Sequence, residues 1–261
     1  MNVHDKFFNS IFISYSHSPN DMSFAKRFRE DLQAKLGDSI QVWMDKDLPA
    51  GKEWRQQIHQ RLNSTSLVVV ILSPDSIHSP WVTYEWHSSL LAQQSEPFLV
   101  HFRKCEDGQL KRFLDHQIPY ALAEDDTRAS TVWTDKHDAI EEILSHIAQR
   151  VDGIADLREY YNVLTCEGEK PEVQQAAADK LGRVSEDLRL AATNYLLAAT
   201  EFWLQHRRYG PVLERIADAL GALGKRKAAL SLVNIFLDQP DYPDALNAVR
   251  RALTNLSRNN P

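Results

Sequence analysis

The run "SLVVVILS" at residues 66–73 constrains the fold more than any other stretch of this sequence. It is rich in β-branched residues, yet it lacks the alternation of apolar and polar residues that marks a strand with one solvated face. Such a run predicts a central strand of a parallel sheet, because helices cover both faces of a parallel sheet. We therefore expect strands that alternate with crossover helices.

The first half of the chain has this alternation. Short β-rich runs are separated by helical patterns, which is typical of strands joined into a mostly parallel sheet. Besides the central run, strands are predicted at 10–15 ("SIFISY"), 40–45 ("IQVWMD"), 97–102 ("PFLVHF") and, as a short fifth strand, 130–134 ("STVWT").

Helical periodicity fills the segments between these strands. Phe24, Phe28 and Leu32 recur every four residues, which predicts a helix that ends at Gly37. Further helices are expected at 54–62, at 81–93 and at 138–151, where an amphipathic helix closes the first domain.

Past residue 152 the strand-like runs disappear and only helical periodicity remains. We predict a first domain at 8–151, a linker or connecting helix at 152–171 and a helical domain at 172–257. Within the helical part, "VQQAAADKLG" (173–182) matches "VLERIADALG" (212–221) at a fixed offset. This repeat resembles the helical hairpins of HEAT repeats.

The composition excludes several classes of protein. A net charge of -6 argues against a dominant affinity for nucleic acid or for an anionic membrane. The two cysteines, Cys105 and Cys166, lie too far apart to indicate a disulfide framework or a zinc site, so no metal is expected. The start of the chain has no signal-peptide pattern, and the longest aliphatic run is too short to cross a bilayer. We expect a cytoplasmic protein with no membrane partner.

Four motifs occur in a specific order: "IFISYSH", "VWMDKDLPAGKEWRQQI", "LVVVILSPDS" and "SPWVTYE". In this order and spacing they resemble the TIR (Toll/interleukin-1 receptor) domain, over roughly residues 8–151. The resemblance implies a flavodoxin-like parallel sheet with ligand chemistry at the carboxyl ends of its strands. The expected fold class is therefore α/β, a flavodoxin-like TIR sheet followed by an all-α helical-repeat domain.

The resemblance assigns a catalytic role to Glu85. Many similar TIR domains from bacteria and plants cleave NAD, and their essential glutamate stands four residues after a tryptophan or a similar residue, as Glu85 follows Trp81. A nearby carboxylate can stabilise the ribosyl oxocarbenium-like state of this cleavage, and nicotinamide leaves as a neutral molecule. The alternative is a glutamate in the first turn of a helix, which complements the helix dipole and is solvated.

The loop after the first strand contacts the nucleotide in this family. NAD-cleaving relatives often have a basic residue there, whereas this chain has Ser16 and His17. Lys46, Lys52 and Arg55 are candidates to supply the missing charge, although such a run of charges is more often simply solvated.

The resemblance implies further contacts with NAD, which is expected as the substrate, with no cofactor. Two of these residues have alternatives: Trp81 as an ordinary core residue, and Ser79 as a helix or turn cap. Trp54 is equally a candidate for the first core residue of its helix. The predicted substrate-binding residues are Tyr15, Ser16, His17, Asp45, Lys52, Trp54, Ser79 and Trp81.

Two functions of different class follow from the resemblance. In the first, the protein is an NAD glycohydrolase or ADP-ribose cyclase, an immune or cell-death effector that self-associates through TIR domains and senses an unknown partner or trigger through the helical domain. In the second, it is a non-catalytic adaptor that associates with other TIR domains through the loop around Pro49. Glu85 discriminates between them, because an adaptor does not require a carboxylate there.

Basic residues in the helical part suggest a third function, nucleic-acid binding. They cluster at hairpin ends, where basic residues also complement helix dipoles. Helical arrays more often bind protein, so nucleic acid is the least favoured partner. The clusters are Arg207-Arg208, Lys225-Arg226-Lys227 and Arg250-Arg251.

Overall fold

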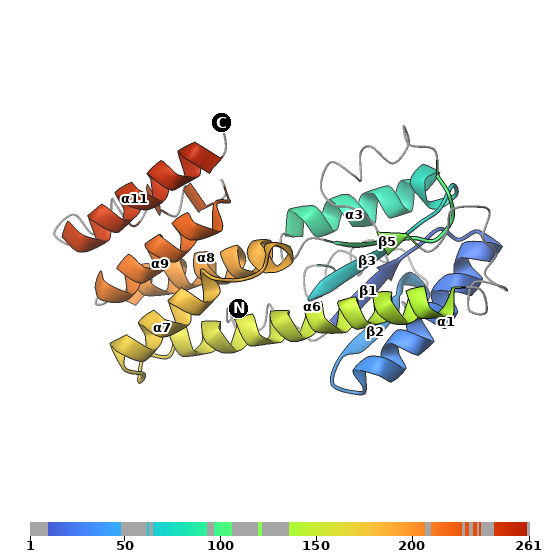
Figure 1. Cartoon of the computed structure of the whole chain (residues 1–261), viewed down its shortest axis with the longest axis horizontal. Helices are drawn as coiled ribbons and strands as arrows, with labels where there is room; N and C mark the ends of the chain where they lie inside the picture. Colours follow the sequence, from blue (N-terminus) through green and yellow to red (C-terminus); the bar gives the residue numbers. More distant parts are fainter. Residues whose placement is uncertain are drawn as a thin grey trace. The chain divides into compact units, whose positions relative to one another are not determined.

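The computed structural model divides the chain into two compact units, Met1–Asp152 and Gly153–Pro261. Unit 1 contains a sheet with helices, and unit 2 is built from helices (Figure 1). The structure describes residues 10–47, 62, 65–92, 97–105, 120–121, 136–206, 210–225, 228–229, 232–233, 235 and 243–259.

Unit 1 is organised around a five-stranded parallel sheet with the strand order β2-β1-β3-β4-β5. This confirms the predicted parallel α/β fold. In this order, β1 and β3 lie side by side, and the chain leads from them toward opposite edges, which makes their carboxyl ends the expected ligand position of such a sheet. The strands are β1 (Ser10–Ser14), β2 (Gln41–Met44), β3 (Leu67–Leu72), β4 (Phe98–His101) and β5 (Tyr120–Ala121).

The central strand β3 is buried along its whole length, as its unalternating apolar sequence predicted. On one face of the sheet, Phe12 and Trp43 lie with their ring centroids 4.3 Å apart. They belong to the same buried cluster as Val82 and Trp86 of helix α3 (Pro80–Ala92). Figure 1 shows α3 on one side of the sheet and α1 on the other.

Helix α1 (Pro19–Leu36) begins and ends as its sequence predicts. Ser18 caps its start by accepting a hydrogen bond from the backbone N–H of Asp21, and Pro19 occupies the first turn. Gly37 ends the helix at a positive φ of 70°, which glycine adopts without strain. The predicted stripe of Phe24, Phe28 and Leu32 is buried.

Helix α6 (His137–Leu164) is longer than the helix predicted at 138–151. The reason is that its apolar periodicity continues without a proline, and Gly153 alone does not end a helix whose neighbours keep a buried stripe. The buried residues of this continuation are Ile154, Leu157, Tyr161 and Leu164.

A short strand that was not predicted pairs with β4. The structure has it at Tyr120–Ala121, and a strand of two residues is too short to produce a periodic sequence signal. The segment predicted as the fifth strand, 130–134, lies outside the described residues, and so does the predicted helix at 54–62 except for Leu62.

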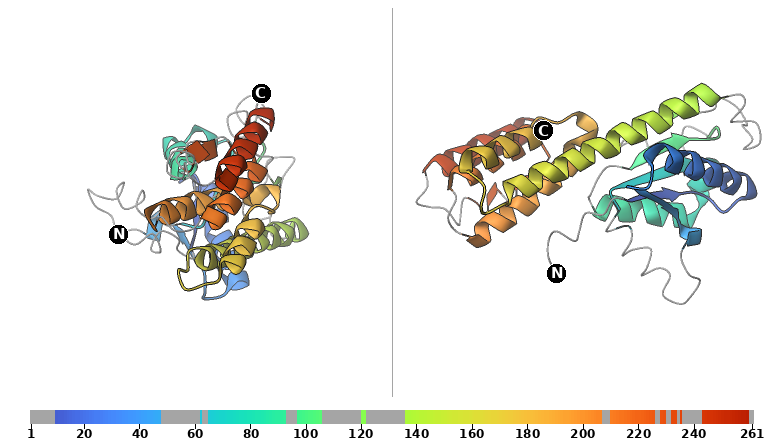
Figure 2. Two further views of the ribbon diagram at one scale, coloured as in Figure 1. Left: turned by 90° about the vertical axis from the view of Figure 1, so that its left-hand side faces the viewer. Right: turned by 90° about the horizontal axis from the view of Figure 1, so that it is seen from below.

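Unit 2 is helical in all its described elements, as predicted for this part of the chain (Figure 2). Trp203 is fully buried, and its indole N–H donates to the carbonyl oxygen of Leu164 at 3.0 Å. Tyr161 and Tyr195 pack beside each other in the same core, with ring centroids 5.5 Å apart. The remaining helices are α7 (Pro171–Leu181), α8 (Arg189–His206), α9 (Gly210–Leu223) and α11 (Pro243–Asn259), with a 3-10 turn, η4 (Glu186–Leu188), before α8.

The two matching segments of the repeat lie on α7 and α9, and their shared glycine has the same packing role in both. A Cβ on Gly182 would lie 2.9 Å from the Cβ of Ala219 on α9. A Cβ on Gly221 would lie 2.6 Å from the Cα of Ala252 on α11. Each glycine therefore permits the close approach of a later helix. The resemblance to HEAT repeats stays a prediction.

One of the basic clusters is engaged within unit 2. Arg251 forms a bidentate ion pair with Asp218, with N–O distances of 2.9 and 3.0 Å. This ion pair neutralises the charge of Arg251 within unit 2. Arg207, Arg208, Arg226 and Lys227 lie outside the described residues. Of the helices that the structure describes, none has the length and apolar character needed to cross a bilayer.

Candidate functional site

Glu85 is a buried carboxyl group at the carboxyl edge of the sheet. It lies in the second turn of α3, and its residue is 4% exposed. Ser14, the last residue of β1, donates a hydrogen bond from Oγ to Glu85 Oε2 at 2.6 Å. The alternative of a solvated glutamate in the first helical turn is therefore wrong. Glu85 is buried because Val82, Glu85 and Trp86 share the face of α3 that packs on the sheet.

Burial controls the protonation of Glu85. Desolvation raises the pKa of its carboxyl from 4.5 to about 8, the hydrogen bond from Ser14 opposes this increase, and the charge of Asp45 adds to it. In the described part of the chain, no ion pair reaches Glu85. At neutral pH, Glu85 is therefore mostly a protonated acid in the resting protein.

Asp45 and His17 lie next to this acid. The register pairs Ile13 of β1 with Met44 of β2, and Ser14 and Asp45 are the residues that directly follow this pair. His17, in the loop after β1, contacts Asp45 Oδ2 through Nε2. The other oxygen, Asp45 Oδ1, is buried and has no hydrogen-bond partner among the described residues.

Two other predicted residues of the loop after β1 also lie at this edge. Tyr15 is buried, and its ring centroid is 5.5 Å from that of His17. Ser16 is buried, and its hydroxyl accepts a hydrogen bond from the backbone N–H of Ser18 at 3.2 Å. This loop therefore holds the imidazole of His17 between the carboxylate of Asp45 and a tilted neighbouring ring, that of Tyr15.

The predicted residues around the start of α3 have more ordinary contacts. The hydroxyl of Ser79 accepts a hydrogen bond from the backbone N–H of Val82 at 3.4 Å, which is a capping contact. Trp81 is partly exposed rather than a core residue, and its ring meets that of Tyr84 edge-on. Lys52 and Trp54 lie outside the described residues, as does Pro49.

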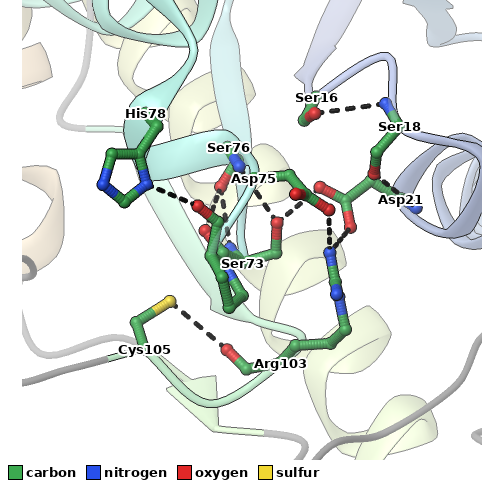
Figure 3. A network of polar contacts seen from close by, with 10 residues as sticks. Ser16, Ser18, Asp21, Ser73, Asp75, Ser76, His78, Arg103 and Cys105 are labelled. Carbon is green, nitrogen blue, oxygen red and sulfur yellow. Dashed lines mark hydrogen bonds and ion pairs between the residues drawn. The ribbon is translucent and has the colours of Figure 1, made fainter.

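A second polar cluster at the same edge was not predicted from the sequence (Figure 3). The side chain of Arg103, which follows β4, points toward two carboxylates. Its Nη2 donates to Asp21 Oδ1 at 2.8 Å and to Asp75 Oδ2. The hydroxyl of Ser73, directly after β3, donates to Asp21 Oδ2. The cluster ties together the segments that follow β1, β3 and β4.

The two carboxylates of this cluster share the single guanidinium of Arg103. Burial raises the pKa of Asp21, and the hydrogen bonds from Ser73 and Arg103 oppose the increase. Burial also acts to raise the pKa of Asp75, but hydrogen bonds from Arg103 and Ser18 outweigh it and lower the pKa. The sequence does contain one indication of this cluster. Arg103 lies two residues after the buried strand β4, where charged residues meet at the edge of the sheet.

The sheet order, the helices on both of its faces and the polar carboxyl edge define an α/β protein of the doubly wound type. Residues 11–144, more than half of the chain, match the family model described as TIR domain, and the chain belongs to this family. No curated protein and no solved structure matches the chain. Among the described residues, no group of three or more His, Cys, Asp or Glu side chains is placed to hold a metal ion.

Proposed function

We propose that the protein cleaves the bond between nicotinamide and ribose in NAD and forms ADP-ribose or a cyclic isomer of it. The observation that supports this proposal is Glu85. It is a buried carboxyl at the carboxyl edge of β1, with a hydrogen bond from Ser14 and no ion pair in the described part of the chain. A buried acid with a strongly raised pKa in this position is a candidate functional group.

The chemistry of the cleavage suits such an acid. The C1′–N bond breaks toward an oxocarbenium-like state, and nicotinamide leaves as a neutral molecule with the electron pair of that bond. The nicotinamide ring of NAD carries a positive charge, and a nearby cation favours the charged form of a carboxyl group. Substrate binding therefore favours release of the Glu85 proton to solvent, and the charge of the resulting carboxylate acts strongly in a buried site.

TIR domains include both NAD-cleaving enzymes and signalling adaptors, so membership of the family is compatible with either function. Glu85 favours the enzyme, because burying a carboxyl group costs stability and a docking surface does not need one at this place. We further propose that the protein is an immune or cell-death effector, that its TIR domains assemble before they act, and that the helical unit receives the trigger.

The proposal is tested by incubating the purified full chain with NAD at low and at high protein concentration. Nicotinamide, linear ADP-ribose and cyclic products are resolved by chromatography, with Glu85→Gln as the matched control because it keeps the shape of the side chain. We expect release of nicotinamide that depends on Glu85 and rises more steeply than linearly with protein concentration. Self-association without any loss of NAD would overturn the enzyme and support the adaptor.

A further inference from the structure

We infer that His17 and Asp45 form a general-base pair that activates the water attacking the ribosyl group. The inference rests on the proposed function and assigns the second half of that reaction. It starts from the contact between His17 Nε2 and Asp45 Oδ2, beside the Ser14–Glu85 hydrogen bond.

The contact determines which ring nitrogen of His17 is available. A carboxylate oxygen only accepts hydrogen bonds, so Nε2 must carry the hydrogen that Asp45 receives. In the neutral ring, Nδ1 then holds the lone pair and can take up a proton. Nδ1 has no hydrogen-bond partner among the described residues, and the side chain of His17 is 55% exposed, so water can reach it.

The pair also lies close to Glu85. Asp45 directly follows Met44, the residue of β2 that pairs with Ile13, and Ser14 directly follows Ile13 and donates to the carboxyl group of Glu85. The charge of Asp45 is felt at Glu85, which agrees with this proximity. Asp45 is mostly buried, with a side-chain exposure of 14%, whereas His17 lies at the solvent side of the pair. The arrangement is a buried carboxylate that orients an accessible imidazole.

The proton balance of the reaction gives this pair a role. After the C1′–N bond breaks, a water oxygen forms a bond to C1′, and one of its protons passes to His17 Nδ1. The imidazolium is stabilised by Asp45 and then releases the proton to solvent. The net reaction converts NAD and water into nicotinamide, ADP-ribose and a proton. Glu85 stabilises the positive charge at C1′ during this step and does not need to accept the proton.

The experiment compares two nucleophiles that compete for the same ribosyl group. Water must lose a proton when it attacks C1′, whereas 3-acetylpyridine attacks through a ring nitrogen that has no proton to lose. The full chain is incubated with NAD and 3-acetylpyridine, and ADP-ribose and the exchanged dinucleotide are both quantified. His17→Gln is compared with His78→Gln, a control at an exposed histidine that bonds the carbonyl oxygen of Pro74.

We expect His17→Gln to lower formation of ADP-ribose by roughly 100-fold while base exchange continues, so that the ratio of the two products changes by about the same factor. Asp45→Asn should change the ratio in the same direction, and His78→Gln should leave it unchanged. Continued base exchange also shows that the variant is folded. A ratio in His17→Gln equal to that of the wild type would overturn the general-base role. Failure of the wild type to release nicotinamide would instead overturn the proposed function.

Discussion

Asp21 and Glu85 are both almost completely buried at the carboxyl edge of the same sheet, with exposures of 0% and 4%. Asp21 accepts hydrogen bonds from Ser73 and from the guanidinium of Arg103. Glu85 accepts a hydrogen bond from the neutral hydroxyl of Ser14, and the charge that influences it is the carboxylate of Asp45. Asp21 therefore has a cation of the protein beside it, whereas Glu85 has none among the residues that the structure describes.

The difference shows what each carboxyl group does. A buried charge that is paired and hydrogen-bonded is a structural element, and Asp21 joins the segments after three strands in this way. A buried acid without a cation is costly for the folded protein. In the proposed function, the missing cation is supplied by the positively charged substrate and by the oxocarbenium-like state that follows.

Substitution of the two acids should affect NAD cleavage very differently. Glu85→Gln should lower NAD turnover by roughly two to four orders of magnitude, about 3 to 5 kcal/mol of barrier, because the charge is lost while the shape is kept. Asp21→Asn should change turnover by less than about tenfold, since Asp21 does not contact the substrate in this proposal. Steady-state release of nicotinamide by the folded variants measures both. Equal losses of activity in the two variants would remove the distinction.

The guanidinium of Arg103 should contribute more to the free energy of unfolding than a cation in an exposed ion pair. Arg103→Met removes the charged partner of Asp21 and should lower the free energy of unfolding by about 3 kcal/mol. Arg251→Met is the matched control, because the ion pair of Arg251 with Asp218 is exposed and should contribute less than about 1 kcal/mol. Chemical denaturation measures both values. A loss for Arg103→Met no larger than that of the control would contradict the structural role of the cluster.

The free energy of unfolding should depend on pH because the pKa of Glu85 differs between the folded and the unfolded protein. Between the unfolded pKa of 4.5 and the folded pKa of about 8, the unfolded chain has lost the proton of Glu85 and the folded protein retains it. The free energy of unfolding therefore falls as pH rises, by about 2 to 3 kcal/mol from roughly pH 6 to pH 8 for this group. Glu85→Gln should lack this decrease. Parallel stability curves for the two proteins would show that Glu85 is ionised in the folded protein.

The hydroxyl of Ser14 should have the smallest effect. Ser14→Ala removes the hydrogen bond that lowers the pKa of Glu85, so the pKa should rise further. The cost in stability should be about 1 kcal/mol, the usual contribution of one hydrogen bond. Ser145→Ala is the control, since its hydroxyl bonds an exposed helical carbonyl oxygen. The measurement is the pH at which stability levels off, and a midpoint unchanged from the wild type would exclude the Ser14 contact as a determinant of this pKa.

Local patterns were sufficient to predict much of the fold. The unalternating run at β3, the stripe on α1 and its stop at Gly37 depend on neighbouring residues alone, and the structure confirms them. The helix predicted at 138–151 and the connecting helix predicted as one alternative for 152–171 form a single helix, α6, as far as Leu164, and periodicity alone did not show that they are continuous. The strand β5 was missed because a strand of two residues gives no periodic signal.

The side-chain contacts of the candidate site could not be predicted from local sequence patterns. Glu85 was identified through its spacing from Trp81 in the family resemblance, but its donor Ser14 is separated from it by 71 residues. The partners Asp21 and Arg103 are 82 residues apart. Which side chains meet across a parallel sheet depends on the order of its strands, and the periodicity of each segment carries no information on that order.

We propose that Glu85 is neutral in the free protein and acts as a carboxylate in NAD cleavage. The most direct test is the pH dependence of kcat/KM for nicotinamide release, which reports the ionisation of groups in the free enzyme. For the wild type, kcat/KM should rise with pH and level off above a midpoint near the Glu85 pKa of about 8. Glu85→Gln should give a low rate without this rise. A Glu85→Gln variant that consumes NAD as fast as the wild type, with the same pH profile, would show that the Glu85 carboxylate does not act in the cleavage.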